Sequence, residues 1–500
     1  MMEKKAKKSV AIIGAGPGGL SAGMILTSKG YDVSIYEKAP FVGGRTSAVK
    51  MGPYTFDLGP TFFHMIDVLE EIFESTGRNL NDYIKLMKLD PLYDLVFEKD
   101  RVLPVTMDRE QMRKNIESLF PGDGEGYARF LAEEEKKFSK VKPALQSSFT
   151  KLSDFFKPEL IKALPYLDFP KSVHEQMGKY FSSDLLKIAF TFQTKYLGMS
   201  PWEAPALFSI LSFLEHDGGI YHVEGGLNQI TKAMGRAIEE DGGQIHLETP
   251  VKKVIIDNKK IKGLELENGT TTTADYYIIN ADFAHAMKNL IPEKDRKKYT
   301  NKKLDNMGYS CSTLIMYLGL SKKYDLSHHT IYISRDYKSN VKEITENSKM
   351  SDDPSFYLHN PSVTDPTLAP EGHSCLYVLV PLPNNDLSFD WKNDQEKFRN
   401  EILDLIIERT GFHDLRENIK AEKIISPIEW ERDYSINKGA VFNLKHNLGQ
   451  MLYFRPRNKF EEYENCYLVG GGTHPGSGLP TIFESGRITS HLIQEAGQLS

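Results

Sequence analysis

A glycine-rich turn near the start of the chain, set between a strand-like and a helix-like segment, constrains the fold most. Ser9–Ile13 is a short apolar run, and Gly14-Ala15-Gly16-Pro17-Gly18-Gly19 follows it directly. A helical pattern then continues to Lys29, and Asp32–Tyr36 alternates as a second strand would. A unit of this kind, about 30 residues long, predicts two parallel strands joined by a helix, in a sheet that helices cover.

Each glycine of the motif has a physical role in such a turn. Gly14 permits the tight turn, Gly16 lets the backbone approach a pyrophosphate, and Gly19 lets the helix pack on the strand. Free N–H groups at the start of the helix favour negative charge there. Glu37 lies 18 residues beyond Gly19, where an acidic side chain accepts hydrogen bonds from ribose hydroxyls and disfavours a 2′-phosphate. These residues predict a dinucleotide site that is not specific for NADP.

A second glycine pair and an arginine, Gly43-Gly44-Arg45, come shortly after Glu37. A plain NAD site has no need of them, whereas a longer cofactor does. The glycines let the chain run close to it, and Arg45 supplies fixed donors to phosphate or flavin oxygens. The N-terminal region therefore predicts FAD; a surface salt bridge is the alternative role of Arg45.

Near the other end of the chain, a strand-like segment leads into a loop that runs from Gly470 to Pro480 and is rich in glycine. Proline suits the first turn of a helix, and apolar residues then recur with helical spacing. A helix start beside a flavin ring would stabilise the negative charge that develops on reduction. His474 in this loop is a weak candidate for a base, the alternative being a histidine that packs or bonds to backbone.

Between the two ends, the segments change character several times. Met65–Pro170 is expected to be mostly helical, and Leu185–Leu214 to form two helices joined by a turn at its prolines. Strands are expected at Thr313–Leu320 and Cys375–Leu382, within a mixed region that ends near Trp430. The fold class is therefore α/β, with a Rossmann-like FAD-binding domain of the two-dinucleotide-binding flavoprotein type and an interleaved mixed α+β domain. The predicted FAD-binding domain comprises 8–75, 221–290 and 431–497, and the predicted substrate-binding and membrane-associating region comprises 76–220 and 291–430.

Composition excludes several classes of function. A net charge of −6 argues against a nucleic-acid partner, which needs a concentrated basic surface. The three cysteines lie far apart and form no CxxC pair, so a reducing cytoplasm is expected. No apolar run is long enough to span a bilayer. The histidines show no local metal-ligand spacing, so no metal is expected.

Several long segments together resemble the bacterial-type phytoene desaturases, the carotenoid desaturase family that includes dehydrosqualene (4,4′-diapophytoene) desaturases. The matching segments are VAIIGAGPGGLSAGMIL, IYEKAPFVGGRTSAV, FDLGPT and YLVGGGTHPGSGLPTIFESGRIT. The resemblance covers nearly the whole chain, and its HPGSGLP portion is the most specific. By position it implies FAD contacts from Gly14, Gly16, Gly19, Glu37, Lys38, Gly44 and Arg45, from Pro60 and Thr61 near the flavin, from Val251 on the adenine side, and from Gly472, Leu479 and Pro480 at the isoalloxazine.

The resemblance also implies an activity. A desaturase of this family introduces successive double bonds into an acyclic C30 or C40 precursor, 4,4′-diapophytoene or phytoene, by hydride transfer to flavin N5. The cofactor carries the difficult step, and the protein supplies alignment and a dry tunnel. Implied partners are the lipophilic polyene, a membrane surface to which the cytoplasmic protein binds peripherally, and an electron acceptor such as quinone or oxygen.

Alternatives remain open on this scaffold. A carotenoid terminal-methyl oxygenase or an isomerase would share all the FAD motifs. A non-catalytic isoprenoid-binding protein of the GDP-dissociation-inhibitor type could dispense with the flavin-facing tail, which is intact here. An amine oxidase is expected to carry aromatic residues in Val469–Ser477, and this segment has none. Substrate length, number of desaturations, electron acceptor, catalytic acid or base and oligomeric state are also left open.

Overall fold

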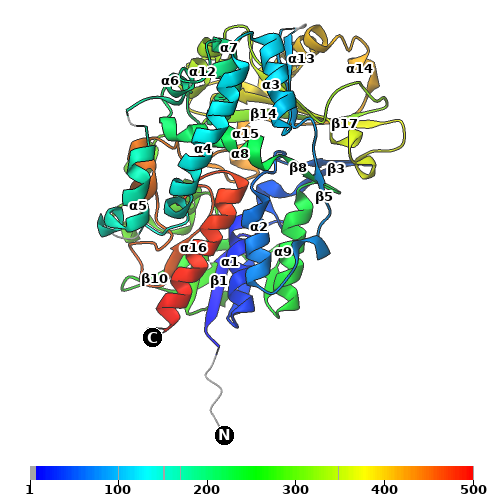
Figure 1. Ribbon diagram of the computed structural model, residues 1–500. Helices are drawn as coiled ribbons and strands as arrows, with labels where there is room; N and C mark the ends of the chain where they lie inside the picture. Colours follow the sequence, from blue (N-terminus) through cyan, green and yellow to red (C-terminus); the bar gives the residue numbers. More distant parts are fainter. Residues whose placement is uncertain (1–6, 99–100, 150–151, 169, 347, 499–500) are drawn as a thin grey trace.

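The structure, a computed structural model, describes residues 7–98, 101–149, 152–168, 170–346 and 348–498. In Figure 1 the chain is arranged in two tiers. The lower tier holds β1 (Ser9–Ile13), α1 (Pro17–Ser28) and α16 (Leu479–Gln498), so segments from both ends of the chain lie together. The upper tier is built from the middle of the chain, and the candidate site lies between the two.

A five-stranded parallel sheet forms the centre of the lower tier. In spatial order its strands are β19 (Cys466–Leu468), β13 (Tyr276–Ile279), β1, β2 (Asp32–Tyr36) and β9 (Gln244–His246). Alternate residues of β1 enter different cores: Val10 and Ile12 pack with the helices, and Ala11 and Ile13 pack on the opposite face. A strand that is buried on both faces must be apolar throughout, which explains the uninterrupted run in the sequence.

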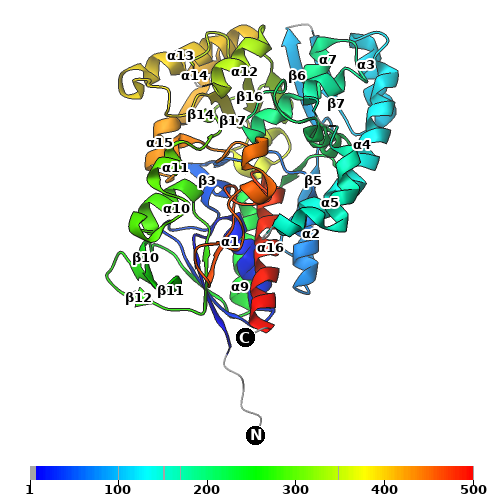
Figure 2. The same cartoon turned by 90° about the vertical axis from the view of Figure 1, so that its left-hand side faces the viewer.

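Helices cover one face of this sheet and a small second sheet covers the other (Figure 1, Figure 2). The helices are α1, α16 and α9 (Asn228–Glu240). On the other face lie α10 (Phe283–Leu290) and a three-stranded sheet of β10 (Val251–Asp257), β11 (Lys260–Leu266) and β12 (Thr271–Thr272). The Rossmann-like α/β class predicted from the sequence is confirmed.

Close packing of α1 on the C-terminal segment explains glycines at two positions. A Cβ on Gly486 would lie 2.7 Å from the carbonyl oxygen of Gly18, and a Cβ on Gly18 would lie 3.2 Å from the backbone nitrogen of Gly470. The Ser21 hydroxyl also donates to the carbonyl of Phe483 at 2.9 Å. The first and last long helices of the lower tier are thus in direct contact, which sets the distance between their N-termini.

The upper tier contains a seven-stranded mixed sheet. Its strands, in spatial order, are β18 (Ile419–Ile425), β14 (Ser312–Leu320), β17 (Ser374–Leu382), β16 (Phe356–His359), β15 (His329–Tyr332), β6 (Tyr93–Glu98) and β7 (Arg101–Val105). One face packs against α13 (Trp391–Thr410), and the other contributes to a large core with α3 (Arg109–Leu119) and α4 (Gly124–Leu145). The strands expected near Thr313 and Cys375 are confirmed.

The expectations for the middle of the chain are confirmed only in part. The described residues of Met65–Pro170 are mostly helical, as expected, but they also form β5 (Leu86–Lys88), β6 and β7, which were not expected. β5 and β6 pair with strands far away in the sequence. Leu185–Leu214 is not two helices but four short pieces. These are α7 (Asp184–Ala189), η5 (Phe192–Leu197), η6 (Ala206–Ser209) and the start of α8 (Ile210–Gly218). Residues 201 and 205 are prolines, which have no N–H for an α-helical hydrogen bond, and the segment breaks there. Among the described residues, no helix combines the length and apolarity needed to cross a membrane.

Candidate active site

A cavity of about 700 Å³ lies between the two tiers, at the carboxyl ends of β1, β2 and β13. Gly14, Glu37 and Asn280, which follow these three strands, all line it. Ligands of open parallel sheets bind at this edge, where helix N-termini also converge. The remainder of the cavity extends upward between α8 and the seven-stranded sheet, where its wall is mainly apolar.

The glycine-rich turn presents bare backbone to the cavity, and Asn280 holds it in place. The Asn280 amide donates to the carbonyls of Gly14 at 2.9 Å and Gly16 at 3.1 Å. Gly14 has φ +95°, and a Cβ there would lie 2.7 Å from the carbonyl oxygen of Asn280. Gly19 does not line the cavity; a Cβ at Gly19 would lie 2.5 Å from the carbonyl oxygen of Gly14, so it serves the packing of α1.

Glu37 is buried at the edge of the cavity, and backbone donors fix its carboxylate. It accepts hydrogen bonds from the N–H groups of Ala15 at 2.7 Å and Ala39 at 2.9 Å. Lys38, Pro250 and Val251 line the same end. The Lys38 ammonium lies 2.7 Å from the Ser435 hydroxyl, and burial lowers its pKa. The two backbone N–H groups hold the Glu37 carboxylate rigidly beside the turn, as a ribose-binding acid requires.

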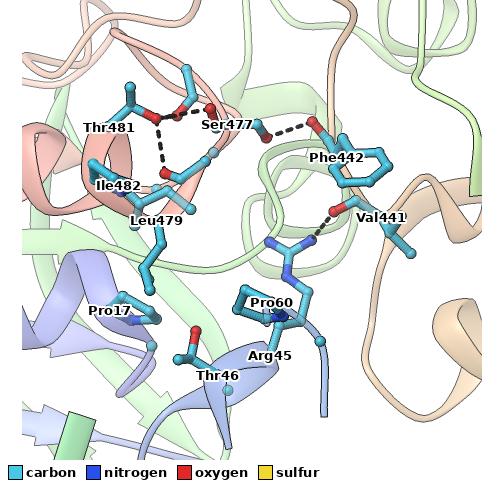
Figure 3. A pocket seen from close by; sticks show the side chains of 18 of the residues that line it. Pro17, Arg45, Thr46, Pro60, Val441, Phe442, Ser477, Leu479, Thr481 and Ile482 are labelled. Carbon is cyan, nitrogen blue, oxygen red and sulfur yellow. Dashed lines mark hydrogen bonds between the residues drawn. The ribbon is translucent and has the colours of Figure 1, made fainter. Parts of the chain in front are cut away.

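Arg45 enters the cavity from the side opposite α16 (Figure 3). It is not a surface salt bridge, because it forms no ion pair among the described residues and its Nη1 donates to the Val441 carbonyl at 2.9 Å. Burial lowers the pKa of its guanidinium, and Asp282 counteracts this. A half-buried cation with directed donors in this place suits the phosphate or flavin oxygens of a cofactor.

The glycine-rich loop near the C-terminus forms the facing wall. Gly470, Gly471 and the segment from Pro475 to Ile482 line the cavity, and α16 begins at Leu479. Arg455 is fully buried behind this loop, and burial lowers its pKa to about 9. Its guanidinium donates to the carbonyls of Leu444, Lys445, Gln450, Gly471 and Thr473. One internal cation thus fixes the shape of the loop.

Two residues predicted for this wall lie behind it. Gly472 does not line the cavity, and a Cβ there would lie 2.6 Å from both Asn443 Oδ1 and Phe283 Cβ. His474 is buried and does not line the cavity either. Its Nε2 donates to the Ser147 carbonyl at 3.0 Å and its ring packs against Phe149. Burial lowers the pKa of His474 to about 4, so the geometry favours a structural histidine.

Leu479, Pro480, Pro60, Thr61 and Gly44 do line the cavity. Figure 3 shows Leu479 on one side of it, with Pro17, Thr46 and Pro60 across from it. The Thr61 hydroxyl lies 2.9 Å from the hydroxyl of Tyr357. Thr61 therefore connects the lower tier to the wall of the upper chamber, the apolar part of the cavity between α8 and the seven-stranded sheet.

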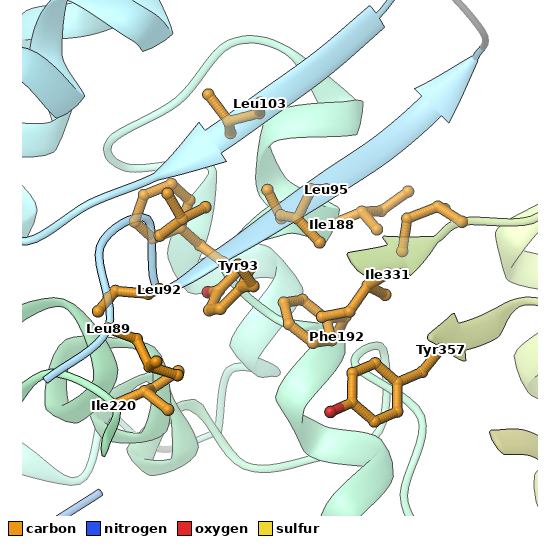
Figure 4. Packing of buried hydrophobic residues seen from close by; sticks show 14 of the residues in the cluster. Leu89, Leu92, Tyr93, Leu95, Leu103, Ile188, Phe192, Ile220, Ile331 and Tyr357 are labelled. Carbon is orange, nitrogen blue, oxygen red and sulfur yellow. The ribbon is translucent and has the colours of Figure 1, made fainter. Parts of the chain in front are cut away.

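Sequence reasoning missed several wall residues. His446 lines the cavity and accepts from the Ser477 N–H at 3.0 Å, while the Ser477 hydroxyl donates to the Phe442 carbonyl at 2.6 Å. Phe192 and Tyr357 line the upper chamber and also belong to the large core (Figure 4). Asn280 could have been found, since it follows an apolar parallel strand; His446 carries no local signal in the sequence.

The residues present fit a flavin dinucleotide. Gly14 and Gly16 present backbone without side chains to the cavity, and two helix N-termini, those of α1 and α16, face it. An apolar chamber continues from this backbone cradle. The arrangement fits the class of dinucleotide-binding flavoproteins, whose cofactor would lie here between a phosphate cradle and an apolar substrate chamber.

Comparison with known proteins agrees with this assignment. Residues 17–494 match the family described as flavin containing amine oxidoreductase. The chain is 50% identical over 488 residues to a 4,4′-diapophytoene desaturase (4,4′-diapolycopene-forming) of Methylomonas sp., covering 98% of this chain and 95% of that protein. It is 35% identical over 501 residues to an all-trans-zeta-carotene desaturase of Myxococcus xanthus, covering 98% and 94%. A putrescine oxidase structure has the same fold, with a TM-score of 0.66 at 13% identity over 98% of this chain and 99% of that one.

The chain belongs to the flavin-containing amine oxidoreductase family, and within it to the carotenoid desaturases, as the resemblance of its motifs indicated. It is an FAD-dependent oxidoreductase.

Proposed function

We propose that the protein is a carotenoid desaturase that introduces successive double bonds into an acyclic C30 precursor, 4,4′-diapophytoene. One observation carries the proposal: the nucleotide cradle opens directly into an apolar chamber within the same cavity. The identity of 50% to a 4,4′-diapophytoene desaturase favours the C30 substrate, whereas relatives near 35% include a desaturase of zeta-carotene.

In the proposed reaction, the cofactor and the protein have different roles. When bound, FAD supplies the hydride acceptor. The chain's own residues hold the polyene in line and keep water out, which is what proximity catalysis requires. The upper chamber is suited to this, since Phe192, Leu379 and Ile331 present apolar surface to it. Hydrophobic contact binds a long hydrocarbon without fixing its register, so one site can act on successive positions of the same chain.

The test is pigment analysis of cells that receive this gene together with a source of either 4,4′-diapophytoene or phytoene. Extracts should gain absorption bands that move to longer wavelength with each new double bond, and the C30 cells should do so first. Equal or faster conversion of phytoene would replace the C30 assignment with C40. If both precursors stay colourless and a coloured carotenoid gains oxygen instead, the protein is an oxygenase.

The division of the chain also belongs to this proposal. Residues 8–75, 221–290 and 431–497 would form the FAD-binding domain, and 76–220 and 291–430 the substrate-binding and membrane-associating region. All strands of the five-stranded sheet come from the first set, and all strands of the seven-stranded sheet from the second. This separation of the sheets supports the assignment.

Peripheral binding of the cytoplasmic protein to a membrane would deliver the water-insoluble substrate. Exposed apolar side chains gather on neighbouring surface segments: Phe156, Ile161 and Leu164 at α5 (Pro158–Ala163) and its flanks, and Phe454 in η12 (Leu452–Phe454). These segments pack into one cluster with Leu207 and Leu452, which also line the cavity. The apolar surface thus lies at the outer end of the substrate chamber, where lipid contact would feed it.

A liposome assay tests this surface. The double variant Ile161→Ser, Leu164→Ser should pellet with anionic liposomes several-fold less than the wild type and convert embedded substrate more slowly, with its FAD content unchanged. Val363→Ser is the matched control, since Val363 is 49% exposed and Ile161 51%, but Val363 does not belong to this cluster. Equal pelleting of all three proteins would show that another surface contacts the lipid. The electron acceptor, a quinone or oxygen, is identified by which of them restores oxidised flavin absorption after substrate is added.

A further inference from the structure

Three buried histidines from distant segments meet outside the cavity. They are His222 in β8 (Tyr221–Val223), His328 just before β15, and His359 at the end of β16. One ring nitrogen of each lies within 4.8 Å of those of the other two. None of the three lines the cavity. His222 and His359 lie 137 positions apart in the sequence, so the expectation of no metal, which rested on local spacing, did not cover this cluster.

The spacing between two of the rings is that of metal ligands. Nε2 of His328 lies 3.2 Å from Nε2 of His359. Both rings are buried. In a tetrahedral site with metal–nitrogen distances of 2.0–2.1 Å, two ligand nitrogens lie about 3.3 Å apart.

Further groups orient these rings. Nδ1 of His328 lies 2.8 Å from the hydroxyl of Thr364, which leaves its Nε2 directed at His359. Metal-bound histidines commonly engage their second nitrogen in this way, and the bond fixes the orientation of the ring. His222 is held by a carboxylate, since its Nε2 lies 3.0 Å from Oδ2 of Asp365.

Asp365 adds a buried negative charge beside the rings. Its carboxylate is fully buried and accepts hydrogen bonds from the Gly225 N–H at 2.7 Å, the Thr367 N–H at 3.0 Å and the Thr367 hydroxyl at 2.6 Å. Among the described residues, its one ion-pair partner is the ring of His222, which is charged only when protonated. A cation in the cluster would balance this charge, which is otherwise costly to bury.

We infer that His222, His328 and His359 bind a divalent transition-metal cation, with Asp365 as the adjacent carboxylate. Imidazole ligands without a thiolate, two of them at tetrahedral spacing and all three buried, fit zinc best. The role is structural, because β8 leads into the turn before α9 in the lower tier, whereas His359 ends a strand of the upper sheet and His328 directly precedes another. The cation would tie the two tiers together behind the cavity.

The bound cation would also support the cavity wall. His329, next to His328, stacks on Phe62 with ring centroids 4.3 Å apart and lies 2.6 Å from the hydroxyl of Tyr357. Phe62 and Tyr357 both line the cavity. A fixed His328–His359 pair therefore holds the strands that carry this part of the substrate chamber.

Metal analysis of the FAD-loaded wild-type protein tests the inference directly. Protein produced with added zinc and dialysed without chelator should retain about one zinc per chain. A strong chelator should remove it and lower the unfolding temperature by several degrees, and zinc should restore that temperature while flavin content stays constant. Cobalt(II) in place of zinc should give the intense visible bands of a tetrahedral site in a difference spectrum against the zinc form.

Variants locate the site. His328→Ala and His359→Ala should each retain less than a tenth of the zinc of the wild type, whereas His216→Ala, a buried histidine outside the cluster, should keep it. The cobalt spectrum of the wild type decides the matter even if a variant fails to fold. Absence of stoichiometric metal and of cobalt bands would overturn the inference and leave a hydrogen-bonded histidine cluster. Full zinc retention in folded His328→Ala and His359→Ala would overturn it too, by placing the metal elsewhere. Neither result bears on desaturation, which the pigment assay decides.

Discussion

Gly16 faces the cavity with ordinary backbone angles, φ −76° and ψ 172°, at the N-cap of α1. A Cβ there would lie 3.2 Å from the Asn280 amide, a tight contact that a small shift can relieve. The fold itself therefore tolerates a side chain at this position better than at Gly14, where φ is +95°. The absence of a side chain at Gly16 is therefore needed more for ligand binding than for folding. A substitution at this position can test binding in a protein that still folds.

Gly16→Val should abolish FAD binding in a folded protein, because the branched side chain occupies the place of the pyrophosphate. The purified variant should lack flavin absorption and gain none on incubation with FAD, while its far-ultraviolet circular dichroism matches that of wild-type apoprotein. A flavin-to-protein ratio equal to that of the wild type would contradict the assigned position of the cofactor.

His474, unlike Gly16, does not line the cavity, although the sequence suggested it as a candidate base. A true base should lose about 10²–10⁴-fold in rate on removal, so His474→Ala should lose much less, below about tenfold in kcat/KM. With a folded-state pKa of about 4 against 6.5 for a free histidine, the folded protein disfavours its protonation. Wild-type stability should therefore fall as the pH drops from 6.5 towards 4, and less steeply in the alanine variant. Thermal unfolding across this range measures the difference.

At the scale of elements, the start of α16 is the part of the site most sensitive to backbone change. Gly478 has φ +112°, next to the residue where the helix begins, and it lines the cavity. Gly478→Val should displace this helix start while leaving the phosphate cradle untouched. A misplacement near 1 Å costs about a hundredfold in rate, so turnover should fall by about that factor while FAD stays bound.

Gly372→Val is the control for Gly478→Val. Gly372 also has a positive φ, +78°, but it has open space around it and lies away from the cavity. Strain alone should then lower the stability of both variants, and only Gly478→Val should lose turnover at full FAD occupancy. Equal losses of turnover would mean that α16 does not align the substrate.

Elements whose cause is local were predictable from the sequence. β1, α1 and β2 follow from an apolar run, a glycine turn and an alternating run, and the structure places them within a residue of the expected bounds. Elements that depend on distant partners were not. β6 pairs with β15, more than 200 residues away in the sequence. The charged residues around β6 obscure its strand pattern in the sequence. Similarly, no sequence pattern predicts the contacts of Arg455 and His446. Arg455 donates to loop carbonyls, and His446 accepts from a loop N–H.

At the scale of the whole molecule, the cofactor cavity joins segments from both ends of the chain and from its middle. Gly14, Asn280 and Leu479 all line it. A ligand that binds only the folded state stabilises it by RT ln(1 + [L]/Kd), about 2.7 kcal/mol at a hundredfold excess over Kd. FAD should therefore raise the unfolding temperature of apoprotein and slow proteolysis near the N-terminal and C-terminal segments together. Differential scanning fluorimetry and mass spectrometry of the early cleavage products measure both effects; protection of one end alone would contradict a shared site.

The order of strands in the five-stranded sheet has a consequence for biosynthesis. β1 lies between β2, which is made almost at once, and β13, which is made some 240 residues later; β13 in turn waits for β19, close to the end of the chain. While the polypeptide is still leaving the ribosome, one edge of β1 has no partner strand, and unpaired edges promote aggregation. The flavin pocket cannot close until α16 has been released. Chaperone protection of the nascent N-terminal segment, and loading of the cofactor only after α16 has been released, follow from this topology.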